Sequence, residues 1–142
     1  MEKSSKVIVE RTVAKGPLRP LGAGEILYYE FNQNNSGGRY KLNENTAEAV
    51  IIAARDAKEA NSRAEDIGIY FDGCSKGYDC DCCGDRWYEI STWSEKGTVE
   101  ALLYGQKPEV YLQDRFYGSR AVIVHHADGT RETFAHHDDK KL

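Results

Sequence analysis

Residues 46–71 read TAEAVIIAARDAKEANSRAEDIGIYF, and the secondary structure of this stretch decides the fold. The apolar run AVIIAA fits either the start of one long helix or a buried strand before a shorter helix. We favour the strand because Asp56, with Glu59 three residues later, resembles a capping box at a helix start. Alanines then recur at helical spacing, and Gly68 is a good helix stop. The stretch therefore predicts a strand, a helix over about residues 57–67, and a second strand over GIYF.

Strand patterns flank this stretch on both sides. The segment EILYYEF is rich in β-branched and aromatic residues, and the turn-forming NQNNSGG follows it, so RYKL at residues 39–42 is predicted to return as a hairpin strand. Further strands are predicted over residues 86–93 and 109–113. Residues 120–135 have two alternating arms around an Asp-Gly turn, which predicts a hairpin.

These elements predict a single α+β domain, in which a mainly antiparallel sheet packs on one short helix and carries a cysteine-rich loop. A chain of 142 residues is long enough for one sizeable core, because a domain of about 150 residues buries about 70% of its unfolded surface. We divide it into an N-terminal strand and linker segment (1–24), the α+β domain (25–135) and a polar tail (136–142).

Composition and charge narrow the function classes. The formal net charge is −4, so nucleic-acid phosphates would repel the molecule as a whole, and nucleic acid is an unlikely partner. The chain has no apolar run near the ~20 residues that cross a bilayer, and its N-terminus lacks the apolar core of a secretory signal. We therefore expect a cytosolic protein with no membrane partner.

The four cysteines of the chain are Cys74, Cys80, Cys82 and Cys83, and all fall within the segment GCSKGYDCDCCGDRW at residues 73–87. Cytosolic thiols stay reduced, so such a cluster indicates a metal site or a catalytic site before it indicates disulfides. The spacing of Cys80, Cys83 and the following glycine is that of a zinc knuckle, and Cys74 could fold back as a third ligand. We predict a structural zinc ion.

The fourth zinc ligand is open between Cys82, His125, His126 and a carboxylate such as Asp79. Acidic neighbours raise the pKa of thiols, and a divalent cation would reverse that penalty, which favours a metal over a nucleophilic thiol. The alternatives are buried, reduced cysteines that act as small apolar residues, and redox chemistry.

Two further groups of residues are candidates for ligand binding. The hairpin end contains Asn32, Gln33, Asn34, Asn35 and Arg39, whose amides and guanidinium could hydrogen-bond a nucleobase or an anion, although a solvated turn has the same composition. Arg86 and Trp87 could stack on a ligand, although an arginine that covers a buried tryptophan is the common arrangement. No catalytic motif has a defensible context, so we expect a protein that is not an enzyme.

The segments YYEFNQNNSGG and GIYFDGC…DCDCCGDRW resemble those of a group of small proteins encoded by tailed bacteriophages. The resemblance covers about residues 27–90. It implies a phage gene expressed in the bacterial host cytoplasm, and it implies no established reaction. Small accessory phage proteins of this kind commonly bind a host protein or sequester a nucleotide signal of antiviral defence.

We therefore predict a non-enzymatic, phage-encoded binding protein that inhibits a host or antiviral-defence component, with a host protein or a small nucleotide signal as its partner. The alternative is a zinc-bearing nucleic-acid-binding module that uses the basic residues of the N-terminal arm. Sheet edges and abundant tyrosine are also compatible with a homo-oligomer. A thiol-dependent enzyme ranks third.

Overall fold

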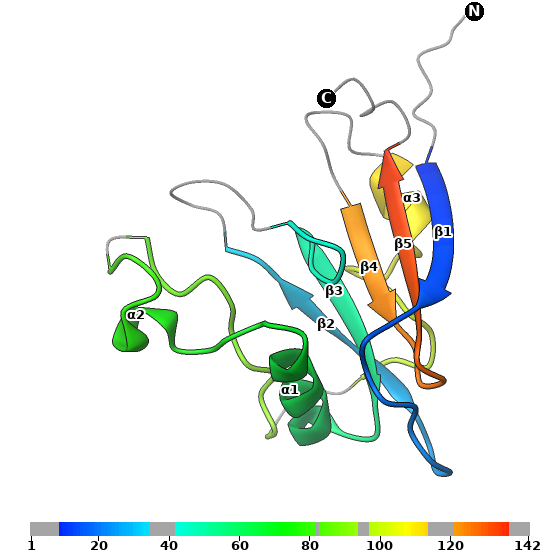
Figure 1. Cartoon of the computed structure of the whole chain (residues 1–142), viewed down its shortest axis with the longest axis horizontal. Coiled ribbons are helices and arrows are strands. Elements are labelled where there is room, and N and C mark those ends of the chain that lie inside the picture. The colour runs from blue at the N-terminus through cyan, green and yellow to red at the C-terminus, as the bar shows by residue number, and fades with distance from the viewer. Residues whose placement is uncertain (1–8, 35–41, 82, 94–96, 114–120, 137–142) are drawn as a thin grey trace, which may run out of the picture.

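The computed structural model describes residues 9–34, 42–81, 83–93, 97–113 and 121–136, which form a single α+β domain around a five-stranded sheet (Figure 1). The strand order is β1-β5-β4-β3-β2, and every neighbouring pair is antiparallel except β3 and β4. This confirms the predicted fold class. The elements are β1 (Val9–Lys15), β2 (Leu27–Asn32), β3 (Ala49–Ala54), α1 (Ala57–Asp66), α2 (Gly73–Lys76), α3 (Pro108–Gln113), β4 (Ala121–His125) and β5 (Thr130–His136).

The stretch that decides the fold adopts the predicted strand and helix. All six residues of β3 are buried, as expected for a central strand covered on both faces. Asp56 caps α1 by accepting a 2.8 Å hydrogen bond from the Glu59 backbone N–H. The Glu59 carboxylate accepts a 2.8 Å bond in return from the N–H of Arg55, one residue before the cap. The cap therefore fixes where the strand stops and the helix begins.

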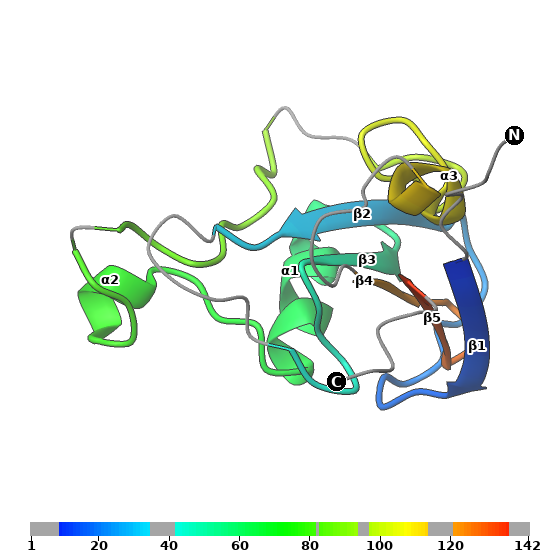
Figure 2. The same cartoon turned by 90° about the horizontal axis from the view of Figure 1, so that it is seen from above.

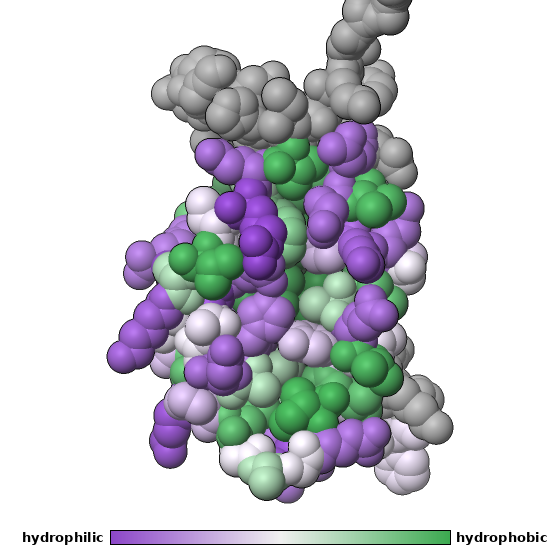
Figure 3. Space-filling model, turned by 90° about the vertical axis from the view of Figure 1, so that its right-hand side faces the viewer, coloured by the Kyte–Doolittle hydropathy of each residue, from purple (hydrophilic) through white to green (hydrophobic). Residues whose placement is uncertain are grey.

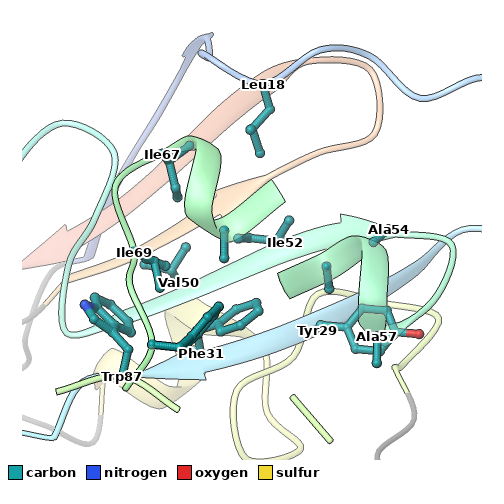
Figure 4. Packing of buried hydrophobic residues seen from close by; sticks show 13 residues of the cluster. Leu18, Tyr29, Phe31, Val50, Ile52, Ala54, Ala57, Ile67, Ile69 and Trp87 are labelled. Atoms are coloured by element: carbon teal, nitrogen blue, oxygen red, sulfur yellow. The ribbon is translucent and has the colours of Figure 1, made fainter. Parts of the chain in front are cut away.

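The sheet buries apolar side chains on both faces. Successive residues of β3 point to opposite sides, so Val50 and Ile52 pack toward α1 whereas Ala49 and Ile51 pack toward α3. Figure 2 shows the curved sheet with these two helices on either side of it. The first cluster, drawn in Figure 4, consists of Leu18, Tyr29, Phe31, Val50, Ile52, Ala54, Ala57, Ala60, Ala64, Ile67, Ile69, Phe71 and Trp87. The second consists of Ala49, Ile51, Leu103, Tyr111, Leu112, Val122, Val124 and Phe134.

Three predicted strands are wrong. Residues 68–71 and 86–93 form no strand. Ile69, Phe71 and Trp87 are instead buried singly in the first cluster, so their apolar side chains stabilise the core without a hydrogen-bonded ladder. Residues 109–113 belong to α3, whose Tyr111 and Leu112 are buried side by side against the sheet. The described residues thus contain three short helices where one was predicted.

The predicted hairpin at residues 120–135 is confirmed as β4 and β5, and the Asp128 carboxylate accepts a 2.9 Å bond from the Thr130 N–H in its turn. β1 pairs with β5 along its whole length, so the N-terminal segment supplies an edge strand. The partner of β2 is β3. Of the predicted strand at 39–42, residues 39–41 lie outside the described part, and Leu42 is not in a strand.

The sheet has two edges, β1 and β2, that differ in character. Every residue of β1 after Val9 is exposed, and the strand carries Arg11 and Lys15, charged side chains of the kind that discourage edge pairing. Figure 3 views the molecule from this side and shows hydrophilic and hydrophobic side chains intermixed. The β2 edge, by contrast, is partly covered by the chain itself.

Candidate functional site

The outer edge of β2 is paired at both ends and open in the middle. Tyr28 exchanges two backbone hydrogen bonds with Thr98, of 2.8 and 2.9 Å. Asn34, just beyond the other end of β2, donates its N–H to the Arg86 carbonyl at 2.8 Å. The backbone groups of every second residue of a strand face the same edge. Those of Glu30 and Asn32 therefore face the outer edge of β2, as those of Tyr28 do. Within the described residues, no backbone group pairs with Glu30 or Asn32 on that edge.

A cleft of about 460 Å³ lies at this opening. One wall is the segment 88–91, whose Ile90 packs against the first core cluster. The other wall contains Leu102, Tyr104 and Gly105. The volume falls in the range of ligand-binding pockets, about 300–1,000 Å³. The outward backbone groups of Glu30 and Asn32 therefore lie at the floor of a cleft between two segments of the same chain.

The charged side chains that line the cleft are both acidic, Glu30 and Glu89. The Glu30 carboxylate accepts hydrogen bonds from the neutral Asn32 amide at 2.8 Å and from the Tyr104 N–H at 3.2 Å. In the described part of the chain, no lysine or arginine forms an ion pair with either carboxylate. Among the described residues, the cleft thus holds two carboxylates without a cation partner.

Exposed aromatic side chains lie at the cleft and next to it. Tyr88 and Tyr104 line it and are 58% and 64% exposed. Trp93 is 95% exposed and lines a neighbouring cavity that shares Glu89, Ile90 and Ser91 with the cleft. Fully exposed tryptophan is unusual on a monomer surface, and tryptophan and tyrosine are enriched where proteins bind one another. We refer to Tyr88, Trp93 and Tyr104 together as the aromatic rim.

The backbone of Tyr104 is strained. Residues 103–106 form a tight turn in which Leu103 and Gln106 exchange hydrogen bonds of 2.7 and 2.9 Å. The two central residues, Tyr104 and Gly105, have φ values of 51° and 80°. Glycine and asparagine favour such positions, whereas tyrosine there costs about 1–2 kcal/mol. Strain of this kind clusters at binding sites.

A glycine brings the chain close enough to pair with the start of β2. A Cβ on Gly97 would lie 2.7 Å from the Leu27 Cβ and 2.9 Å from the Tyr28 carbonyl oxygen. Since real Cβ atoms do not approach that closely, only glycine lets residues 97–98 reach the strand. The closed end of the cleft therefore depends on this position.

The structure brings the two sequence segments predicted to bind a ligand against each other. Gln33 is buried, donates to the Ala47 carbonyl at 2.7 Å and accepts from Arg86 at 2.9 Å. The Asn34 side chain donates to the carbonyls of Cys83 and Asp85, both at 3.0 Å. These polar groups bind the protein itself and dock the cysteine segment onto the end of β2.

The other predicted ligand-binding residues are divided. Asn32 lines the cleft and donates to Glu30. Trp87 is 2% exposed in the first core cluster, where its ring is unable to stack on a ligand. Asn35 and Arg39 lie outside the described residues.

Replacing Asn34 by alanine should lower the free energy of unfolding by about 1–2 kcal/mol, because two carbonyl groups lose their donor. Asn32→Ala is the matched control, since among the described residues that amide donates to the partly buried Glu30 alone, and it should cost less than about 0.5 kcal/mol. Urea unfolding followed by tryptophan fluorescence measures both. Equal stability of the two variants would contradict a docking role for Asn34.

Asp79 organises the cysteine segment. Its carboxylate accepts 2.8 Å bonds from the Tyr70 hydroxyl and from the Arg86 N–H. Asp85 in turn accepts from the Cys74 N–H at 2.9 Å. Figure 1 shows α2 and this segment projecting beyond the end of β2.

The structure describes three of the four cysteines. Cys74, Cys80 and Cys83 are thiols, and Cys82 lies outside the described residues. Burial, reinforced by the carboxylates of Asp85, Asp81 and Asp79, raises the pKa of Cys74 to about 11. No group of three or more His, Cys, Asp or Glu among the described residues could hold a metal ion. The four-cysteine zinc site therefore stays a prediction, which the zinc content of purified protein tests.

A second cavity of about 490 Å³ lies where β2 meets the β4–β5 turn. There the Tyr28 hydroxyl hydrogen-bonds His126 Nδ1 at 2.8 Å, and His126 Nε2 hydrogen-bonds Glu132 at 2.7 Å. Arg11 also pairs with Glu132. Burial alone would raise the pKa of Glu132, but the bonds from His126 and Arg11 outweigh it and the pKa is lowered. This line of side chains joins three strands, and nothing in the sequence pattern pointed to it.

The sequence pattern of the domain of unknown function DUF7296 matches residues 26–142. The chain belongs to this family. The DUF7296 region contains both walls of the cleft, the cysteine segment and four of the five strands. Comparison with curated proteins and with solved structures finds no match. None of the described helices is long and apolar enough to cross a bilayer.

Sequence reasoning missed most of the cleft. It identified Asn32, but Glu30, Glu89 and Tyr104 went unnoticed because each is an ordinary residue in its local pattern. The available indication was the aromatic residues Tyr88 and Trp93 in the segment 86–93, which is predicted from the sequence as a strand.

Proposed function

We propose that this DUF7296 protein is a phage-encoded, non-enzymatic binding protein that acts in the host cytoplasm by engaging a host protein. The observation that carries the proposal is the cleft on the open stretch of the β2 edge, with its rim of exposed aromatic side chains. The resemblance to small proteins of tailed phages supports the proposed origin and the host setting.

A protein partner has more support than a nucleotide signal. The side chains predicted to hold a nucleotide, Gln33, Asn34 and Arg86, are bonded within the protein. The charged residues that line the cleft are carboxylates, which repel phosphate groups. We therefore expect no thermal stabilisation by cyclic dinucleotides or by ADP-ribose derivatives.

The test compares capture of host proteins by immobilised wild type and by two rim variants. Trp93→Ala removes a 95% exposed side chain, and Tyr104→Asn removes an aromatic ring while asparagine tolerates the positive φ, so both variants should fold. Tyr78→Ala is the matched control, because Tyr78 is as exposed as Tyr104, at 64%, but lies in the cysteine segment.

The expected result is one host protein that wild type and Tyr78→Ala retain and that both rim variants lose at least tenfold, as for a hot-spot aromatic. Retention of the same proteins by all four forms would contradict a role for the cleft. An increase in the melting temperature on addition of a nucleotide would contradict a protein partner and favour a nucleotide signal as the ligand.

A further inference from the structure

We infer that the cleft binds a short extended peptide segment carrying basic side chains, which adds as a strand to the open part of the β2 edge. The inference rests on the proposed function and names the chemistry of the partner. It follows from three observations: the position of the open backbone groups, the length of the gap, and the charge of the walls.

The backbone groups at the gap are arranged for strand addition. Tyr28 already pairs with Thr98 in antiparallel fashion on this edge, so the edge accepts a neighbouring strand. Glu30 and Asn32 continue the same series of outward N–H and C=O groups, two residues apart. An extended segment in the cleft would satisfy these groups, and backbone pairing of this kind supplies affinity that does not depend on sequence.

The gap fits a short segment. Tyr28 and Asn34, the two residues at which this chain pairs with the edge, are six positions apart, or about 20 Å at the strand rise of about 3.4 Å. The end positions are occupied by Thr98 and Arg86, so three or four residues of a partner can lie between them. A longer partner strand must bend away at both ends.

The residues of the two walls determine which side chains of a partner the cleft favours. Alternate residues of an added strand point to opposite walls, toward Glu30 and Tyr104 on one side and toward the segment containing Tyr88 and Glu89 on the other. Two carboxylates without a cation partner among the described residues favour lysine or arginine, and the aromatic rim covers the aliphatic stems of such side chains. Charge complementarity thus favours a basic segment over an acidic one.

A second copy of the chain fits this edge less well. Pairing of two β2 edges would place two uncompensated Glu30 side chains on neighbouring strands, and like charges there are destabilising. A homo-oligomer through this cleft is therefore an outcome that would overturn the inference, and sedimentation velocity of wild type and Glu30→Gln detects it.

The test uses an end-blocked, fluorescein-labelled peptide of eight residues in which four central lysines, two facing each wall, are flanked by valines, and fluorescence polarisation as the readout. Two control peptides accompany it. In one, glutamate replaces lysine; in the other, the two central backbone nitrogens are methylated, which removes strand hydrogen bonds in either register. We expect both controls to bind at least tenfold more weakly than the lysine peptide.

Variants of the full chain test the walls. Glu30→Gln and Glu89→Gln should each weaken binding of the lysine peptide by about three- to tenfold, as for a partly desolvated charge pair. Glu100→Gln, which makes the same change at an exposed position outside the cleft, should leave binding unchanged. Equal binding of the methylated peptide would overturn strand addition, and equal binding of the glutamate peptide would overturn the basic preference.

The two proposals fail in different ways. If the rim variants lose their host protein but the lysine peptide does not bind, the cleft is a protein-binding site and the inference about strand addition is wrong. If the rim variants keep their host protein, the proposed function itself is wrong.

Discussion

Replacing Gly73 with alanine should lower the free energy of unfolding by about 2–4 kcal/mol, a large effect for the addition of one methyl group. The new Cβ would lie 1.9 Å from Asp79 Oδ2, 2.6 Å from its Cγ and 2.8 Å from Tyr70 Cε1. Asp79 cannot move away freely, since its carboxylate holds the Tyr70 hydroxyl and the Arg86 N–H. The clash therefore breaks the bonds that organise the cysteine segment.

Gly77→Ala is the matched control in the same segment. Its φ is +83°, and no described atom lies within 4 Å of a Cβ there, so the substitution costs only the backbone strain of about 1 kcal/mol. Urea unfolding followed by the fluorescence of the buried Trp87 compares the two variants. Equal losses for Gly73→Ala and Gly77→Ala would show that the contact with Asp79 does not organise the segment.

Acidification from pH 7 to pH 5 should destabilise wild type by about 2 kcal/mol more than His125→Gln. His125 is 1% exposed, and burial, aided by the positive charges of Arg131 and Arg63 and by His126, lowers its pKa to about 4. Only the bond to the Asn45 carbonyl opposes this shift. Glutamine can still donate to that carbonyl but does not titrate.

The direction follows from proton binding in the two states. Between pH 6.5 and pH 4 the unfolded histidine binds a proton that the folded one does not, so the stability present above pH 6.5 is lost as the pH falls toward 4. Carboxyl groups of lowered pKa, such as Glu132, lose their contribution only below about pH 4.5. Thermal unfolding at pH 7, 6 and 5 separates the two effects. Parallel curves for wild type and His125→Gln would contradict a neutral, buried His125.

The elements that the sequence predicted correctly are those with local determinants. The Asp56 cap set the β3–α1 boundary, and the Asp-Gly turn set the β4–β5 hairpin. The segment 109–113 was misjudged because its short apolar run, Val110 to Leu112, resembles a strand, although Pro108 at the first helical position indicates a helix. Ile69 and Phe71 alternate as in a strand but bury their side chains without pairing.

The site could be predicted only in part because it is built from pairings distant in sequence. Gln33, Asn34 and Arg86 are predicted from the sequence as ligand-binding residues, whereas in the structure their polar groups hydrogen-bond within the protein across about fifty residues. The middle of the β2 edge is open because Thr98 and Arg86 pair at either end of it, and none of the described residues between them pairs with that edge. No local pattern encodes such an interruption.

The central claim is that the open edge of β2 accepts a strand, and amide hydrogen exchange read residue by residue tests it most directly. On addition of the lysine–valine peptide, we predict that exchange of the Glu30 and Asn32 amides slows at least tenfold, while the exposed amides of β1 are unchanged. Saturating peptide that leaves the Glu30 and Asn32 amides exchanging at their original rates would contradict the claim.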